Sequence, residues 1–262
     1  MSELRAGLTR GEFQMLYQPK LELGPGRVIG AEALIRWNHP TRGRVLPDEF
    51  ISLAEETGNI QHLTRWALRV GLTEAGYWRG QGLPARVAVN LSVRDLADDT
   101  LPIRIESLLR ELQISSRCLV LEITESAIMG EPDAAIAVLR RLDEMGIDLA
   151  IDDFGVGQSS FAYLRRLPVR EIKLDKAFVM KLAENPDDQA IVRAITELGH
   201  GLGYRVTAEG VQDAHCLRLL REFGCDYAQG YYIGKPMTSR SFMGFMAESH
   251  DRWAPGPTEP VS

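Results

Sequence analysis

The chain has 262 residues, of which 45% are hydrophobic and 25% charged, which is enough to bury the core of one sizeable domain. The formal net charge of −6 and the absence of a basic run argue against a nucleic-acid polymer or an anionic membrane as partner. The sequence has no run of about 18 apolar residues and no signal peptide, so we expect a soluble cytoplasmic protein without membrane contact. Cys118, Cys216 and Cys225 lack metal-ligand spacing and are interpreted as core residues.

Strand and helix candidates alternate along the chain. Apolar runs predict eight strands, at 16–22, 27–37, 86–93, 118–124, 147–153, 171–175, 204–209 and 225–232. Amphipathic spacing predicts helices between most of them, at 47–58, 60–79, 101–112, 133–146, 187–203, 213–224 and 239–250. Gly146, Gly203 and Gly224 end three of these helices, where a left-handed cap would favour glycine.

This order predicts an α/β fold, a modified TIM (β/α)₈ barrel with an antiparallel opening strand. Continuous apolar strands alternating with helices indicate a parallel sheet covered on both faces. The first connection, 23–27, is too short for a parallel crossover, so the first two strands must be antiparallel. A doubly wound sheet is the alternative. We expect a single domain over residues 1–250 and a proline-rich, disordered tail over 251–262.

Acidic or amide side chains stand where predicted strands end. Six of them carry oxygen donors: Glu32, Asn90, Glu122, Asp152, Asp153 and Glu209. Lys173 and Gln229 end two further strands. A carboxylate at the end of an apolar run is costly to bury unless something pairs with it. Because the C-terminal strand ends of a barrel form one rim, these donors predict a site for a hard cation such as Mg²⁺ or Mn²⁺.

The adjacent acids Asp152 and Asp153 point to opposite sides of a regular strand, but both can reach metal if the strand ends there. Such a pair can bridge two cations about 3.5–4 Å apart, as in in-line phosphoryl displacement. Lys173 would lie near these cations, and their positive charge would lower its pKa so that it could hold or deprotonate a water.

The segments around these residues resemble the EAL-domain family. Glu32, Ala33 and Leu34 form the EAL signature itself, and YQPK, NLS, EITES, DDFGVG, EIKLDKAFV, AEGV and DYAQGYYIGKP match the rest of the pattern in order. The resemblance covers about residues 5–245. It implies a metal-dependent phosphodiesterase that hydrolyses cyclic-di-GMP to linear pGpG, on a barrel whose opening strand is antiparallel.

The resemblance also implies roles at the matching positions. Two ions, Mg²⁺ or Mn²⁺, are expected, one held by Glu32, Asn90, Glu122 and Asp152, the other by Asp152, Asp153 and Glu209. Lys173 would position the attacking, metal-activated water, and Glu125 would anchor the loop after Asp153. Whether Lys173, Glu209 or the metal pair acts as the base is left open. Gln18, Arg36 and Gln229 would contact the substrate. A homodimer is expected, with a GGDEF or sensory module preceding this domain in a longer parent protein.

Several positions depart from the family pattern. Val156 replaces the usual Thr, Gln158 the usual Tyr, Gln212 the usual acid, and QPK at Lys20 replaces QPI. All the expected metal ligands and Lys173 remain, which favours an active enzyme. The alternatives are a catalytically weak or inactive cyclic-di-GMP receptor of the same fold and a metal-dependent barrel enzyme that acts on another substrate.

Overall fold

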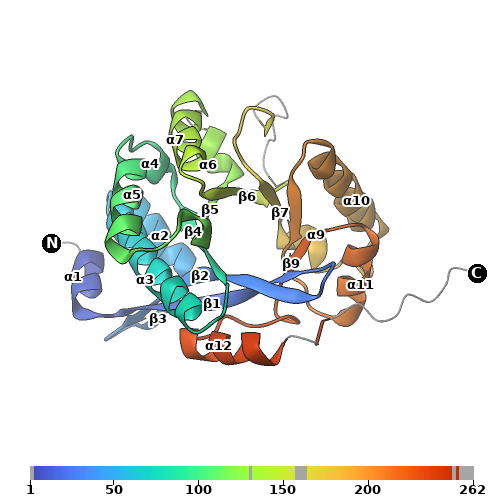
Figure 1. Cartoon of the computed structure of the whole chain (residues 1–262), viewed down its shortest axis with the longest axis horizontal. Helices are drawn as coiled ribbons and strands as arrows, with labels where there is room; N and C mark the ends of the chain where they lie inside the picture. Colours follow the sequence, from blue (N-terminus) through green and yellow to red (C-terminus); the bar gives the residue numbers. More distant parts are fainter. Residues whose placement is uncertain (1–2, 130–131, 157–163, 250–251, 254–262) are drawn as a thin grey trace, which may run out of the picture.

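A closed barrel of strands ringed by helices forms the body of the molecule (Figure 1). The computed structural model describes residues 3–129, 132–156, 164–249 and 252–253. Eight strands make the ring: β1 (Phe13–Glu22), β2 (Arg27–His39), β4 (Arg86–Leu91), β5 (Leu119–Thr124), β6 (Asp148–Phe154), β7 (Glu171–Leu174), β8 (Arg205–Ala208) and β9 (Tyr227–Gln229). The predicted modified barrel is confirmed, and pairing of β1 with both β2 and β9 excludes the doubly wound alternative.

The opening strand β1 runs against its two neighbours, as the short first connection predicts. It is antiparallel to β2 and to β9, whereas the remaining neighbours from β2 through β9 around the ring are parallel. The far end of β2 extends beyond the ring and forms a hairpin with β3 (Gly43–Val45). The sequence reading missed β3, because three residues carry no usable periodicity.

Helices follow most strands and cover the outside of the ring. The seven predicted ones are α2 (Pro47–Glu56), α3 (Ile60–Gly80), α5 (Leu101–Leu112), α7 (Pro132–Glu144), α10 (Pro186–Gly201), α11 (Ala214–Glu222) and α12 (Ser239–Glu248). Short elements that were not predicted are α1 (Glu3–Arg10), α4 (Val93–Leu96), α6 (Glu125–Met129), α9 (Lys176–Val179) and the 3₁₀ turn η1 (Ser116–Cys118). Gly146, Gly203 and Gly224 have positive φ, which confirms the predicted left-handed caps.

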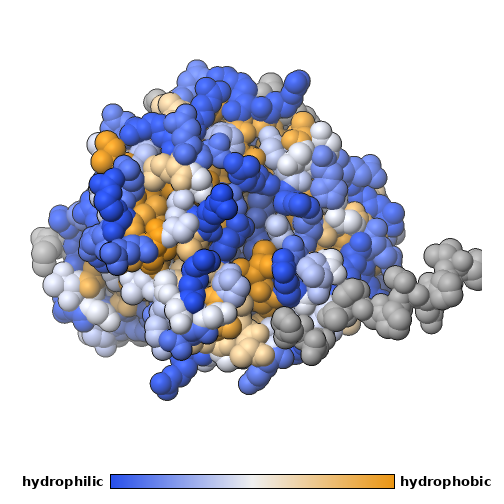
Figure 2. Space-filling model, viewed as in Figure 1, coloured by the Kyte–Doolittle hydropathy of each residue, from blue (hydrophilic) through white to orange (hydrophobic). Residues whose placement is uncertain are grey.

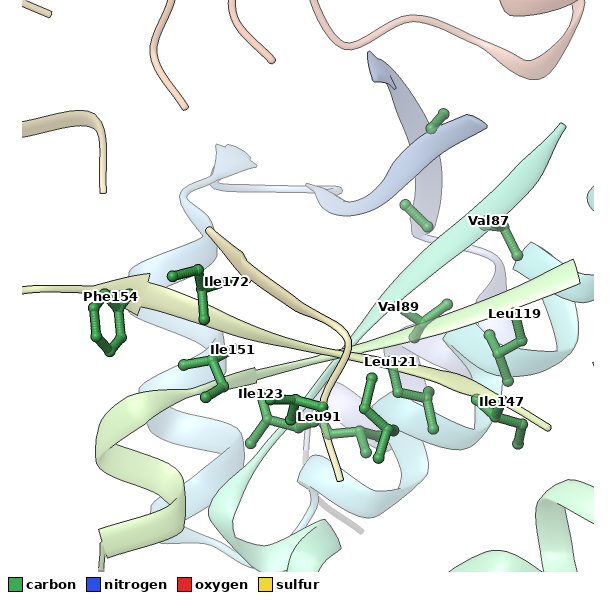
Figure 3. Packing of buried hydrophobic residues seen from close by; sticks show 14 of the residues in the cluster. Val87, Val89, Leu91, Leu119, Leu121, Ile123, Ile147, Ile151, Phe154 and Ile172 are labelled. Atoms are coloured by element: carbon green, nitrogen blue, oxygen red, sulfur yellow. The ribbon is translucent and has the colours of Figure 1, made fainter. Parts of the chain in front are cut away.

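The main core lies between the strands and the helices. Odd-numbered residues along β4 and β5, and along β6 as far as Ile151, face outward, and Figure 3 shows Val89, Leu121 and Ile151 among them. Cys118, Cys216 and Cys225 are buried free thiols, as predicted. Because successive side chains of a strand point to opposite faces, the even-numbered residues Asn90, Glu122 and Asp152 point into the barrel.

A second, smaller core lies where β2 leaves the ring. Phe13 stacks on Trp37 with ring centroids 5.0 Å apart, and Leu4 of α1 and Phe50 of α2 pack into the same cluster. Trp37 donates a hydrogen bond from Nε1 to Glu12, at 2.9 Å. This cluster fixes the outer half of β2, the strand that also carries Glu32 and Arg36.

The molecular surface follows from the amphipathic helices. On the face seen in Figure 2, hydrophilic residues predominate and hydrophobic residues form smaller areas between them. Among the residues that the structure describes, none of the helices is long and apolar enough to cross a membrane. Of the predicted tail, Arg252 and Trp253 are described, and Trp253 is buried against Tyr232 with ring centroids 5.4 Å apart. Residues 251 and 254–262 lie outside the described part.

Candidate active site

Polar side chains from all eight barrel strands meet inside the ring, towards the C-terminal ends of the parallel strands. They are Gln18 of β1, Glu32 of β2, Asn90 of β4, Glu122 of β5, Asp152 of β6, Lys173 of β7, Glu209 directly after β8, and Gln229 of β9. The expectation that each stands at a strand end is wrong for Glu32, which is the sixth of 13 residues in β2. The reason is that β2 continues past the rim into its hairpin with β3.

Lys173 lies at the centre of these side chains and is fully buried. Its Nζ is 2.7 Å from Glu209 Oε1, 2.8 Å from Glu122 Oε2 and 3.0 Å from Asp152 Oδ1. Glu32 Oε2 is somewhat farther, at 3.6 Å. One ammonium group therefore faces four carboxylates, which leaves the site with an excess of negative charge.

Two amide side chains hold Glu32 in place. Asn90 donates to Glu32 Oε1 at 2.8 Å, and Gln229 donates to Glu32 Oε2 at 2.7 Å. Gln229 also lies 3.3 Å from Gln18 Oε1, which joins β9, β2 and β1 at the rim. Gly230 makes this possible, because a Cβ there would come within 2.2 Å of the Val211 backbone nitrogen. The predicted partners Gln18, Asn90 and Gln229 thus form one hydrogen-bonded group with Glu32.

Asp153 adopts an unusual backbone conformation that brings it to the same side as Asp152. Its φ is 53°, a left-handed value that is unfavourable for a residue with a Cβ, and the β6–β7 register is irregular between Ile151 and Phe154. The prediction that the strand ends at Asp153 is wrong, because β6 continues to Phe154. The local irregularity instead brings both acidic side chains to one side. Such strain is retained where the surroundings require it, often at functional sites.

The acidic side chains form two overlapping groups suited to cations. Glu32, Glu122 and Asp152 offer oxygens within 4.8 Å of one another, and so do Asp152, Asp153 and Glu209. Asp152 belongs to both groups. Glu122 Oε1 is buried and accepts no hydrogen bond from the described residues, so this oxygen is available as a metal ligand. Clustered carboxylate oxygens are the donors that Mg²⁺ and Mn²⁺ prefer, so the residues present fit such ions.

Burial and crowding shift the pKa values of the site. Burial, assisted by the charge of Asp152, raises the pKa of Glu209 to about 8 and that of Asp153 to about 6. Burial also raises the pKa of Glu122 well above its ordinary value. Burial opposes the charged form of Lys173, but the surrounding carboxylates outweigh it and raise the lysine pKa. The protein's own carboxylates therefore raise the pKa of Lys173, whereas bound cations are expected to lower it.

A cationic groove lies farther along β2. Arg36 is four residues beyond Glu32 on the same strand face, which corresponds to about 13 Å. The groove has a volume of about 320 Å³, and its lining includes Arg36, Arg44, Lys235, Leu46, Pro47 and Tyr231. Tyr231 is 64% exposed, and the Lys235 ammonium lies 5.6 Å from its ring centroid. Arg44, Tyr231 and Lys235 were not singled out from the sequence, because only the fold brings the β2–β3 hairpin next to the segment after β9.

Glu125 begins α6, next to the strand that carries Glu122. It is buried, and neither carboxylate oxygen has a hydrogen-bond partner among the described residues. The loop that it was expected to anchor includes 157–163, which lie outside the described residues, as does the departure at Gln158. The anchoring role of Glu125 stays a prediction.

A second layer of side chains lies beneath the site, two residues along each strand. Under Glu32, Asn90, Glu122 and Asp152 this layer is small and apolar, and we call Gly30, Ala88, Val120 and Ala150 the apolar floor. Under the other half lie Lys20, Glu171, Thr207 and Tyr227, which we call the polar floor. Sequence reasoning noted Lys20 only as a departure and missed its pairing with Glu171. The pairing could have been inferred from the spacing, because Lys20 follows Gln18 by two residues and Glu171 precedes Lys173 by two, which places both on the inner face.

The comparisons with known proteins agree on one family. The EAL domain model matches residues 1–236. Cyclic di-GMP phosphodiesterase PA2567 of Pseudomonas aeruginosa is 41% identical over 229 residues, covering 87% of this chain and 39% of that protein. Cyclic di-GMP phosphodiesterase PdeR of Escherichia coli is 37% identical over 241 residues, covering 92% of this chain and 36% of that protein. The chain therefore spans well under half the length of these two relatives.

A solved structure gives the same result for the fold. The PaMucR phosphodiesterase in complex with c-di-GMP superimposes with a TM-score of 0.87 and is 38% identical. The match covers 92% of this chain and 98% of that one. The barrel is therefore shared with a structure of known ligand.

Proposed function

The chain belongs to the EAL-domain family, and we propose that it hydrolyses cyclic-di-GMP to linear pGpG with the help of two divalent cations. The observation that carries this proposal is the pair of acidic groups that share Asp152 and surround Lys173. A non-catalytic receptor would not need this excess of oxygen donors at the bottom of its binding site.

In this proposal, Glu32, Asn90, Glu122 and Asp152 would hold one ion, and Asp152, Asp153 and Glu209 would hold the second. Mg²⁺ and Mn²⁺ both suit such oxygen donors. When bound, the ions lower the pKa of water towards neutrality and neutralise charge that develops on the phosphate. Asn90 and Gln229 fix the Glu32 carboxylate by hydrogen bonds of 2.8 and 2.7 Å, so its oxygens are oriented before an ion arrives.

Lys173 supplies hydrogen-bond donors rather than a proton acceptor. In the metal-free protein four carboxylates outweigh burial and raise its pKa, so it is there an ammonium group with three N–H donors. It orients an attacking water, and it offsets negative charge next to the reacting phosphate. Glu209 also carries its proton near neutral pH in the metal-free protein, because burial raises its pKa to about 8, and it can act as the base only once it is ionised.

The cationic groove accounts for recognition of the rest of the substrate. Arg36 and Lys235 offer charge to a phosphodiester, and the exposed ring of Tyr231 offers a stacking face to a base. Gln18 donates to the Gly234 carbonyl, next to Lys235 of the groove, and Gln229 donates to Glu32; in this proposal both contact the sugar-phosphate backbone. Arg44 adds a further cation that the sequence reading did not include.

The deciding experiment is chromatography of cyclic-di-GMP after incubation with the protein and Mn²⁺ or Mg²⁺, with EDTA as the control. We expect pGpG to form only when metal is present. Intact nucleotide, together with binding by calorimetry, would reject hydrolysis in favour of the receptor alternative. Comparison of the two metals gives the preferred ion. Homodimerisation stays a prediction, and light scattering with and without nucleotide would test it.

A further inference from the structure

We propose that the buried Lys20–Glu171 ion pair braces the barrel interior and positions Lys173, Glu209 and Gln229 for turnover, an inference that rests on the proposed function. Both side chains lie one layer beneath the site, and neither reaches the reacting atoms. They are positioning residues in this assignment.

One oxygen of Glu171 accepts two hydrogen bonds inside the barrel. Lys20 Nζ donates directly to Glu171 Oε1, and the Thr207 hydroxyl donates to the same oxygen at 2.6 Å. Lys20 Nζ also lies 4.9 Å from the ring centroid of Tyr227. Lys20 is 7% exposed and Glu171 5%. A charged pair this deep is worth little for stability by itself, because both ions lose their hydration.

The place where the pair lies suggests its purpose. β1 joins β9 through only three residue pairs, from Lys20–Gln229 to Glu22–Tyr227, and β9 joins β8 through only two. By comparison, ten pairs join β1 to β2 and five join β4 to β5. Two neighbouring short ladders therefore close the barrel at β8, β9 and β1, and β8–β9 is the shortest in the ring; β2–β4 and β6–β7 have three pairs each. The ion pair runs from β1 to β7 and so spans this closure from inside.

Residues of the active site sit directly on this closure. Thr207 precedes Glu209 by two residues, Glu171 precedes Lys173 by two, and Tyr227 precedes Gln229 by two. Gln229 ends its three-residue strand and donates to Glu32. A shift of about 1 Å in catalytic groups can lower a rate a hundredfold, so a loosened closure affects turnover more than substrate affinity.

The test is the double variant Lys20→Met/Glu171→Gln, which removes both charges and keeps a carbonyl acceptor for Thr207. We expect kcat to fall about tenfold or more, with KM and the Mn²⁺ requirement within about threefold of wild type. Such replacements are often neutral for stability, so the melting temperature should stay within about 4 °C. Amide hydrogen exchange should accelerate about tenfold in 16–22 and 225–233, but not in β4 and β5.

Two further variants make the result specific. Lys20→Arg retains the charge and should recover most of kcat. Arg69→Met/Glu111→Gln removes an exposed ion pair of 2.7 Å between α3 and α5 and should change neither kcat nor exchange. Unchanged kcat and exchange in the Lys20→Met/Glu171→Gln protein would overturn the brace. If wild type itself fails to hydrolyse cyclic-di-GMP, the proposed function is wrong, and the exchange measurement alone still decides whether the pair closes the barrel.

Discussion

The two halves of the barrel interior are built differently. Glu32, Asn90, Glu122 and Asp152 come from β2, β4, β5 and β6 and lie over the apolar floor; β4–β5 and β5–β6 have five pairs each and β1–β2 has ten, although β2 joins β4 through three. Lys173, Glu209, Gln229 and Gln18 come from β7, β8, β9 and β1 and lie over the polar floor, where β7–β8 has four pairs, β1–β9 three and β8–β9 two. Backbone pairing is denser in the first half, and buried polar side chains join the strands of the second.

This difference suggests a division of labour. Cation ligands need fixed positions, because affinity depends on the distances between oxygens, and the first half supplies most of them. The groups that orient water, transfer a proton and touch substrate lie in the other half. We therefore expect substitutions in the two halves to separate metal binding from turnover.

The largest effect is expected for Glu32→Ala, in the first half. The variant removes a ligand of the first acidic group and leaves the amides of Asn90 and Gln229 without their acceptor. We expect Mn²⁺ affinity to fall about tenfold or more and pGpG formation to be abolished. Calorimetry with Mn²⁺ and chromatography of the product measure the two effects. Glu56→Ala on the exposed side of α2 is the matched control, and retained turnover in the Glu32 variant would refute the metal assignment.

The next effect is expected for Lys173→Ala, in the second half. Turnover should fall about 10²–10⁴-fold, while nucleotide binding stays largely intact. The metal-free protein should lose about 3–5 kcal/mol of stability, because four carboxylates lose their only buried cationic partner among the described residues. Steady-state kinetics, calorimetry and urea unfolding in EDTA give the three values. Lys176→Ala, exposed on α9, is the control. A matching loss of nucleotide affinity would make Lys173 a substrate contact instead.

The stability of the metal-free protein should depend on pH through Glu209. Its pKa is raised by burial from 4.5 to about 8, so the folded state favours the protonated form. The stability due to this proton is fully present below pH 4.5 and is lost as the pH rises through 8. We therefore expect Glu209 to contribute a decrease of about 3–5 kcal/mol in the free energy of unfolding in EDTA between pH 5 and pH 8, and Glu209→Gln should remove this part. Glu122 and Asp153, whose pKa values are also raised, add a decrease of the same sign that the variant retains. Urea titrations at four pH values provide the test.

Metal should reverse that trend, since ligation requires the ionised carboxylates. Mn²⁺ affinity should increase with pH across the range in which Asp153 and Glu209 titrate, near 6 and 8. Calorimetry in buffers of different ionisation enthalpy should show proton release on binding. An affinity that does not change with pH would mean that these two carboxylates are not ligands.

The sequence predicted the active-site layer of the barrel interior far better than the apolar and polar floors beneath it. Strand-end acids such as Glu122 and Asp152 stand out because charge is rare in apolar runs, and their motifs come in a fixed order. Lys20 and Glu171 are also charged residues in apolar runs, but their pairing depends on closure of β1 against β9 and β8. Ladders of two and three residues leave no periodicity that would reveal this closure. The positive φ of Asp153 was likewise invisible, because nothing in the residue types fixes the bulge.

The smallest effect is expected for Val156→Thr, at a departure from the family pattern outside both halves. Val156 is 63% exposed, and it follows Gly155, whose φ of 99° turns the chain away from β6. Thr has nearly the same shape as Val and adds a hydroxyl that can reach solvent, so stability should change by less than about 0.5 kcal/mol. We expect kcat and the Mn²⁺ requirement to change by no more than about threefold, because the two acidic groups and Lys173 are held by the strands. A change of about tenfold or more would show that the loop after Asp153 takes part in holding the second acidic group, and the division between the two halves would then have to include it.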